Sequence, residues 1–230
     1  MWKSLIWKEW HEQRWRLVFG CCVLLSMTFV GLHTRLAEDE GIIGLVTVVG
    51  AVLLPALHAT SLISPEREER SWTTLVTLPL PARCVFLIKT AVGAAVVAAP
   101  FLASGVIALL VAGGREMASS KIAALFAMSA GSAVMMFIWC TAVGARKANE
   151  AHSILAAIGA MGVWGLAMMA AVMVVQTPLN WVLYSSPLGL LALNGPSDSK
   201  PVIVLVQLAI GAGLWVWGAA QFSQPVKSRG

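Results

Sequence analysis

Long apolar stretches separated by short polar ones dominate the chain. A helix crosses the hydrocarbon core of a bilayer with about 20 apolar residues, at about 1.5 Å per residue. Lipid offers no hydrogen-bond partners to open strand edges, and the period-two alternation of a barrel is absent, so strands are disfavoured. The pattern therefore predicts an all-α integral membrane protein. Six segments meet or approach the spanning length: residues 17–32, 41–63, 90–112, 122–144, 154–175 and 202–221.

The N-terminal segment, residues 1–16, has a different pattern. Apolar side chains such as Trp2, Leu5 and Trp10 recur at helical spacing, and lysine, arginine and glutamate fill much of the rest. Amphipathic helices rich in tryptophan and basic residues lie in the membrane interface. The segment is therefore predicted to be an interface helix, and the short first span is expected to borrow a turn from it. A simple anchor and a helix that also positions a cytoplasmic partner both fit.

Prolines mark the irregular points of the pattern. Pro55 and Pro100 lie inside predicted spans, where they predict kinks and not breaks. Residues 176–201 contain four prolines and one brief apolar patch. This segment is too interrupted to span, and we expect short helices that dip into the outer leaflet.

Composition and charge support this topology. The 230 residues are 58% hydrophobic and 12% charged, which is typical of membrane proteins. With the N-terminus inside, twelve basic residues fall in cytoplasmic segments and four in outer loops, so the positive-inside rule predicts both termini in the cytoplasm. The isoelectric point near 9.3 then reflects topology signals, and no nucleic-acid partner is predicted. The twelve are Lys3, Lys8, Arg14, Arg16, Arg67, Arg70, Arg83, Lys89, Arg146, Lys147, Lys227 and Arg229.

The predicted loop at residues 64–89 concentrates charge between two uncharged stretches, with five consecutive charged residues at 66–70. Because each charge at the bilayer centre costs about 2.5–3.5 kcal/mol, the loop is assigned to the cytoplasm. Its 26 residues exceed the roughly 2–8 needed to connect neighbouring helices. Ser64 and Pro65 predict a helix start, and Pro79 and Pro81 predict its end. A solvated helical loop and a docking element for a soluble partner both fit.

Catalytic chemistry finds little support in the sequence. His58 is the one histidine inside a predicted span, and we expect a neutral imidazole bonded to a neighbouring helix. No second histidine or acid accompanies it in the apolar spans, so no metal site is predicted. An intramembrane serine protease would use Ser104, Ser129 or Ser132, but the G-x-S-x-G context is absent and helix packing explains these serines. The chain also lacks the G-x-x-x-x-G-K-[ST] motif of ATP-binding P-loops.

The stretch "EREERSWTTLVTLPLPARCVFLIK" resembles the cytoplasmic loop of type-2 ATP-binding-cassette (ABC) exporter permeases. The opening "WKSLIWKEWHEQRW" is similar to the N-terminal interface helix of the same family. Six predicted spans, both termini inside and a proline-bearing outer segment before the last span match as well, so the resemblance covers nearly the whole chain.

The resemblance implies that this loop is a coupling helix in a cleft of a separate ABC ATPase subunit. Two permeases, identical or homologous, and two ATPases would form the working unit in a bacterial inner membrane. The ATPase would bind ATP, and this chain would hold no cofactor, metal or catalytic residue. Many family members have glycine where this chain has Arg70, which puts the local turn in question. Glu66 and Glu68 would pair with basic residues of the ATPase, Trp72, Leu75 and Leu78 would pack in its cleft, and Pro79 and Arg83 would fix the return to the membrane.

The resemblance also implies that spans two and five border the translocation route. The expected lining is His58, Met161, Trp164 and Met168. Because the spans carry no charged pocket, a hydrophobic or amphipathic cargo is expected, while its identity and the choice between homodimer and heterodimer stay open. The alternative is a non-catalytic membrane scaffold or assembly factor, which gives no reason for the ordered charged loop.

Overall fold

The computed structural model describes residues 2–33, 50–59, 61–62, 81–112, 119–145, 150–174, 186–187, 189–190 and 200–223. Within these ranges all extended regular structure is α-helical, as predicted. The long helices are α1 (Trp2–His33), α4 (Ala82–Ala112), α5 (Ser119–Gly144), α6 (Glu150–Val174) and α8 (Lys200–Phe222). A shorter helix covers Gly50–Ala59. Among the described residues, three segments are long and apolar enough to cross a membrane, namely Ala82–Leu110, Ile122–Gly144 and Lys200–Phe222.

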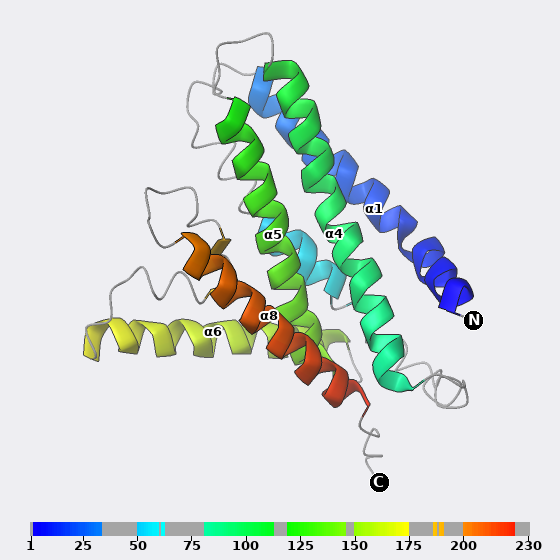
Figure 1. Cartoon of the computed structure of the whole chain (residues 1–230), viewed down its shortest axis with the longest axis vertical. Helices are drawn as coiled ribbons and strands as arrows, with labels where there is room; N and C mark the ends of the chain where they lie inside the picture. Colours follow the sequence, from blue (N-terminus) through cyan, green and yellow to red (C-terminus); the bar gives the residue numbers. More distant parts are fainter. Residues whose placement is uncertain are drawn as a thin grey trace.

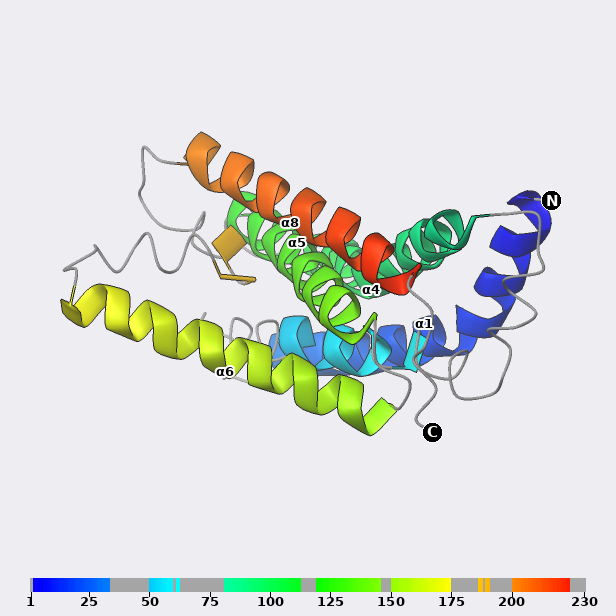
Figure 2. The same cartoon turned by 90° about the horizontal axis from the view of Figure 1, so that it is seen from below.

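The helices α1, α4, α5 and α8 form an elongated bundle, and α6 lies across it (Figure 1). The start of α1 and the end of α8 lie at the same end of the bundle. Viewed from below, α1 bends between its N-terminal part and the remainder (Figure 2). The interface segment and the first predicted span are thus two parts of one helix, consistent with the expected sharing of a turn.

Small residues allow the helices to approach closely. A Cβ atom on Gly93 of α4 would meet the Phe137 ring of α5 at 2.5 Å, and one on Gly105 would meet Phe126 at 2.9 Å. Gly20 of α1 similarly faces the ring of Pro100. Such contacts are the usual means of helix association in lipid, where van der Waals packing has to replace the hydrophobic effect. The largest fully buried side chains of the core are Leu24, Phe86, Phe101, Phe137, Ile203 and Phe222.

The helices extend beyond the predicted hydrocarbon segments. Helix α4 begins at Ala82, eight residues before the predicted third span, and the Pro81 carbonyl accepts a hydrogen bond from the Cys84 amide at 2.8 Å. The difference has a simple cause: hydropathy marks the part of a helix that lies in lipid, whereas backbone hydrogen bonds continue past that border. Helix α4 also continues without a break through Pro100, as predicted.

The fifth predicted span coincides with α6, which covers all of residues 154–175 except the last. Near the start of α6, Ser153 and Ala157 are buried, whereas most of its later described side chains are exposed. The second predicted span is described only at residues 50–59 and 61–62. The complete count of six spans therefore stays a prediction.

Candidate functional site

A buried ion pair connects the first helix to the start of α4. The Glu9 carboxylate lies 2.7 Å from the Lys89 ammonium group. Glu9 is 1% exposed and Lys89 is 2% exposed. Removing two charges from solvent is costly unless they compensate each other closely, so this pair holds α1 and α4 in one register.

The ion pair continues into a hydrogen-bonded chain that reaches the helix Gly50–Ala59. Gln13 Nε2 donates to the Glu9 carboxylate at 3.5 Å, and Gln13 Oε1 lies 3.1 Å from His58 Nε2. A carboxylate only accepts hydrogen bonds, so the Gln13 amide group points its nitrogen at Glu9 and its oxygen at His58. His58 therefore carries its proton on Nε2 and donates it to Gln13. The expected bond from His58 to a neighbouring helix is confirmed.

One face of α1 brings these polar groups inward. Glu9 and Gln13 lie one turn apart, and the buried residues Gly20, Leu24 and Thr28 continue their face along the helix. The large aromatic side chains of the same helix are turned outward: Trp7, Trp10, Trp15, Phe19 and Phe29 are exposed. This arrangement differs from the expected interface helix, in which Glu9 belongs to a water-facing side. Lipid offers no hydrogen-bond partners, so the polar face of a membrane helix can turn toward polar groups of neighbouring helices as well as toward water.

The sequence does not single out Lys89 and Glu9 as site residues. In the sequence analysis Lys89 is counted among the basic residues that indicate topology, and Glu9 belongs to the polar face of residues 1–16. The available signal is the i, i+4 spacing of Glu9 and Gln13, in line with the later buried positions of α1. A lone lysine directly before a 25-residue uncharged stretch is the matching signal on α4.

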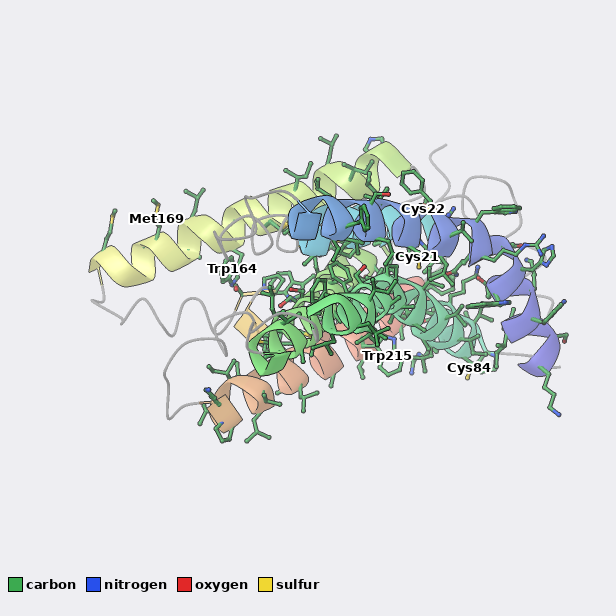
Figure 3. All side chains as sticks on the ribbon, turned by 90° about the horizontal axis from the view of Figure 1, so that it is seen from above. Cys21, Cys22, Cys84, Trp164, Met169 and Trp215 are labelled. Atoms are coloured by element: carbon green, nitrogen blue, oxygen red, sulfur yellow. The ribbon has the colours of Figure 1, made fainter. Side chains whose placement is uncertain are left out.

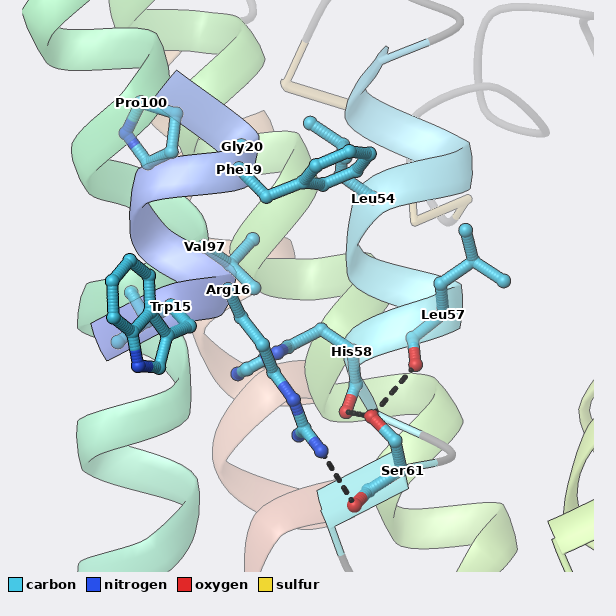
Figure 4. Close-up of a pocket in the computed structure, with 11 residues that line it drawn as sticks. Trp15, Arg16, Phe19, Gly20, Leu54, Leu57, His58, Ser61, Val97 and Pro100 are labelled. Carbon is cyan, nitrogen blue, oxygen red and sulfur yellow. Dashed lines mark hydrogen bonds between the residues drawn. The ribbon is translucent and has the colours of Figure 1, made fainter. Parts of the chain in front are cut away.

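A pocket of about 370 Å³ opens beside this network, between α1, α4 and the helix Gly50–Ala59. Arg16, His58 and Ser61 lie at one end, and the walls toward the other end are apolar (Figure 4). Arg16 donates a hydrogen bond to the Ser61 carbonyl at 3.4 Å. The apolar lining consists of Trp15, Phe19, Gly20, Leu54, Leu57, Val96, Val97 and Pro100.

The residues predicted to line the substrate path do not lie together in this pocket. Of its residues, His58 lines the pocket, whereas Met161 packs against the hydrophobic core from α6. Trp164 projects from α6 toward the side of the other helices, and Met169 projects away from them (Figure 3). The side chain of Met168 lies outside the described part of the chain.

The predicted coupling residues fall mostly outside the described residues. Arg83 lies exposed in the first turn of α4. The role assigned to Arg83 stays a prediction, as does that of the remaining six. Those six, all outside the described residues, are Glu66, Glu68, Trp72, Leu75, Leu78 and Pro79.

The serines that an intramembrane protease would use form no hydrogen bond with His58. Ser104, Ser129 and Ser132 are fully buried, and within the described chain their hydroxyl oxygens have no hydrogen-bond partner. His58 is engaged with Gln13 instead. Among the described residues no three histidine, cysteine, aspartate or glutamate side chains are grouped to hold a metal ion. The polar groups of this site thus join α1, α4 and the helix Gly50–Ala59.

The fold and the composition define a class, a helical membrane protein. Comparison with models of known protein families and with curated proteins gives no match that would narrow this class.

Proposed function

We propose that the chain is the permease subunit of an ABC exporter, with ATP hydrolysis carried out by a separate subunit. The resemblance of residues 66–89 and of the N-terminal segment to type-2 permeases is the starting point. In this proposal the complex contains two permeases and exports a hydrophobic or amphipathic substrate across a bacterial inner membrane. The six-span topology, the coupling helix and the cytoplasmic location of both termini belong to the same proposal.

The buried Glu9–Lys89 ion pair is the observation that carries the proposal. A permease has to convert a movement of its cytoplasmic loop into a movement of its membrane helices, which requires a stiff connection. Helix α4 begins at Ala82, three residues after the proposed coupling helix ends at Pro79. About two turns further on, Lys89 binds Glu9 of α1. A force on the loop would therefore reach α4 and α1 together.

Contacts within the bundle also support the transmission of a force from the loop through α4 to other helices. The Trp215 indole donates a hydrogen bond to the Thr90 hydroxyl at 2.6 Å, which connects α8 to α4 directly beside Lys89. The start of α1 and the end of α8 lie at the end of the bundle where α4 begins (Figure 1). A cytoplasmic subunit bound at that end would be adjacent to α1, α4 and α8.

Co-purification tests the proposal. The chain is isolated from native membranes in mild detergent, and its partners are identified by mass spectrometry. The wild type is expected to bring down an ATPase with a P-loop, and a Glu66→Lys/Glu68→Lys variant is expected to lose it. The matched control, Glu38→Lys/Glu40→Lys, makes the same charge change in the predicted outer loop and should retain the ATPase. Absence of any ATPase from an intact wild-type complex would favour the scaffold alternative.

A further inference from the structure

The pocket between α1, α4 and the helix Gly50–Ala59 has the two-part character of a lipid site. Its volume, about 370 Å³, lies within the roughly 300–1,000 Å³ common for ligand sites. Eight of its eleven lining residues are apolar, and the polar ones gather at one end (Figure 4). An amphiphile with a compact polar head and an apolar tail matches this division.

The polar end is cationic. Arg16 and His58 are the ionisable residues that line the pocket, and no carboxylate of the described chain lines it. Glu9, the nearest acid of the network, is already paired with Lys89 at 2.7 Å. Arg16 carries five N–H donors, and its hydrogen bond within the described chain goes to the Ser61 carbonyl at a long 3.4 Å. The guanidinium group thus keeps donors for an anion, and its planar fork fits two phosphate oxygens.

The position of Arg16 along α1 fits the depth of a lipid headgroup. Its neighbour Trp15 is 70% exposed, and outward tryptophans mark the interface between headgroups and hydrocarbon. Phe19 and Gly20, about one turn further along α1, begin the apolar part of the pocket. Basic pockets between membrane helices are known to bind anionic headgroups.

We propose that this pocket binds an acidic phospholipid, with the phosphate on Arg16 and an acyl chain along Phe19, Leu54, Leu57, Val97 and Pro100. The bound lipid bridges α1, α4 and the helix Gly50–Ala59 on the membrane-facing side of the Glu9–Lys89 network. The site does not depend on the proposed export function, because it follows from the pocket alone.

Native mass spectrometry of the purified full chain in detergent tests the site. Dioleoyl phosphatidylglycerol is titrated against dioleoyl phosphatidylcholine, and glycerophosphoglycerol supplies the same headgroup without acyl chains. Both lipids present a phosphate to Arg16, but the choline cation of phosphatidylcholine cancels the headgroup charge beside the guanidinium group. Because a charge-assisted contact typically changes affinity by about ten-fold or more, phosphatidylglycerol should bind at least about ten-fold more tightly than phosphatidylcholine. Equal binding of the two lipids by the wild type overturns the proposal. Equally tight binding of glycerophosphoglycerol also overturns it, since the site would then recognise a soluble anion.

Two pairs of variants assign the binding to this pocket. Arg16→Gln should weaken phosphatidylglycerol binding about ten-fold, whereas Arg14→Gln, a basic residue outside the pocket, should leave it unchanged. Leu57→Trp fills the pocket mouth from a 64%-exposed position, and Leu53→Trp is its 56%-exposed control outside the pocket. Thermal unfolding without lipid checks that each variant is folded. Wild-type affinity in both Arg16→Gln and Leu57→Trp would show that the lipid binds elsewhere.

Discussion

At the scale of single residues, the Glu9–Lys89 pair concentrates two full charges in an almost water-free contact. Such a pair contributes less through its own attraction than through the penalty that appears when one partner is removed. The remaining charge then stays buried and uncompensated. The pair consequently ties the stability of α4 to the position of α1.

Replacing Lys89 with methionine should lower the free energy of unfolding by about 3–5 kcal/mol, because Glu9 is left as an unpaired buried charge. The double variant Glu9→Gln/Lys89→Met should recover much of this loss. Thermal unfolding in detergent measures both. As a control, Lys8→Met breaks the exposed pair with Glu12 at 3.6 Å and should cost no more than about 1 kcal/mol. A double variant as unstable as Lys89→Met alone would contradict the assigned pairing.

At the scale of elements, α8 is held against two helices at one glycine. A Cβ atom on Gly218 would meet the Phe86 ring of α4 at 2.8 Å and the Ala142 backbone of α5 at 3.0 Å. The backbone contact cannot be relieved by a rotamer change. A Cβ atom on Gly213, in the same helix, would meet no neighbouring element of the described chain within 4 Å, so the two glycines separate packing from helix propensity.

Gly218→Val should therefore reduce the free energy of unfolding by about 1–3 kcal/mol through overpacking. Gly213→Val introduces the same side chain with the same helix propensity at an open position and should be close to neutral. Detergent unfolding followed by circular dichroism compares the two. Equal effects of the two substitutions would mean that α8 does not pack on α4 and α5 through Gly218.

Most of the helices can be predicted from the sequence, but the buried Glu9–Lys89 network cannot. Uninterrupted apolar runs predict α5 and α8 to within three residues at each end. The start of α4 is not predicted, because hydropathy identifies only the part of a helix that lies in lipid. Periodicity places Glu9 and Gln13 on one face of α1, but it cannot say whether a polar face meets water or another helix. The partner of Glu9 lies 80 residues away, at a distance that no local pattern spans.

At the scale of the whole molecule, the starts of α1 and α4, the end of α8 and the buried ion pair lie at one end of the bundle (Figures 1 and 2). The proposed coupling helix immediately precedes α4, so an ATPase that binds it would contact this end. The opposite end holds the ends of α1 and α4 and the start of α5. The proposed function therefore places the ATPase at the end of the bundle where α4 begins.

Site-specific photo-cross-linking in native membranes tests where the ATPase binds. A benzophenone amino acid replaces Trp72 in the proposed coupling helix, and in a matched chain it replaces Trp181 in the predicted outer segment. We expect a cross-link from position 72 to an ATPase that carries a P-loop, and no such cross-link from position 181. Cross-linking of the ATPase from position 181, or of no ATPase from position 72, would contradict it.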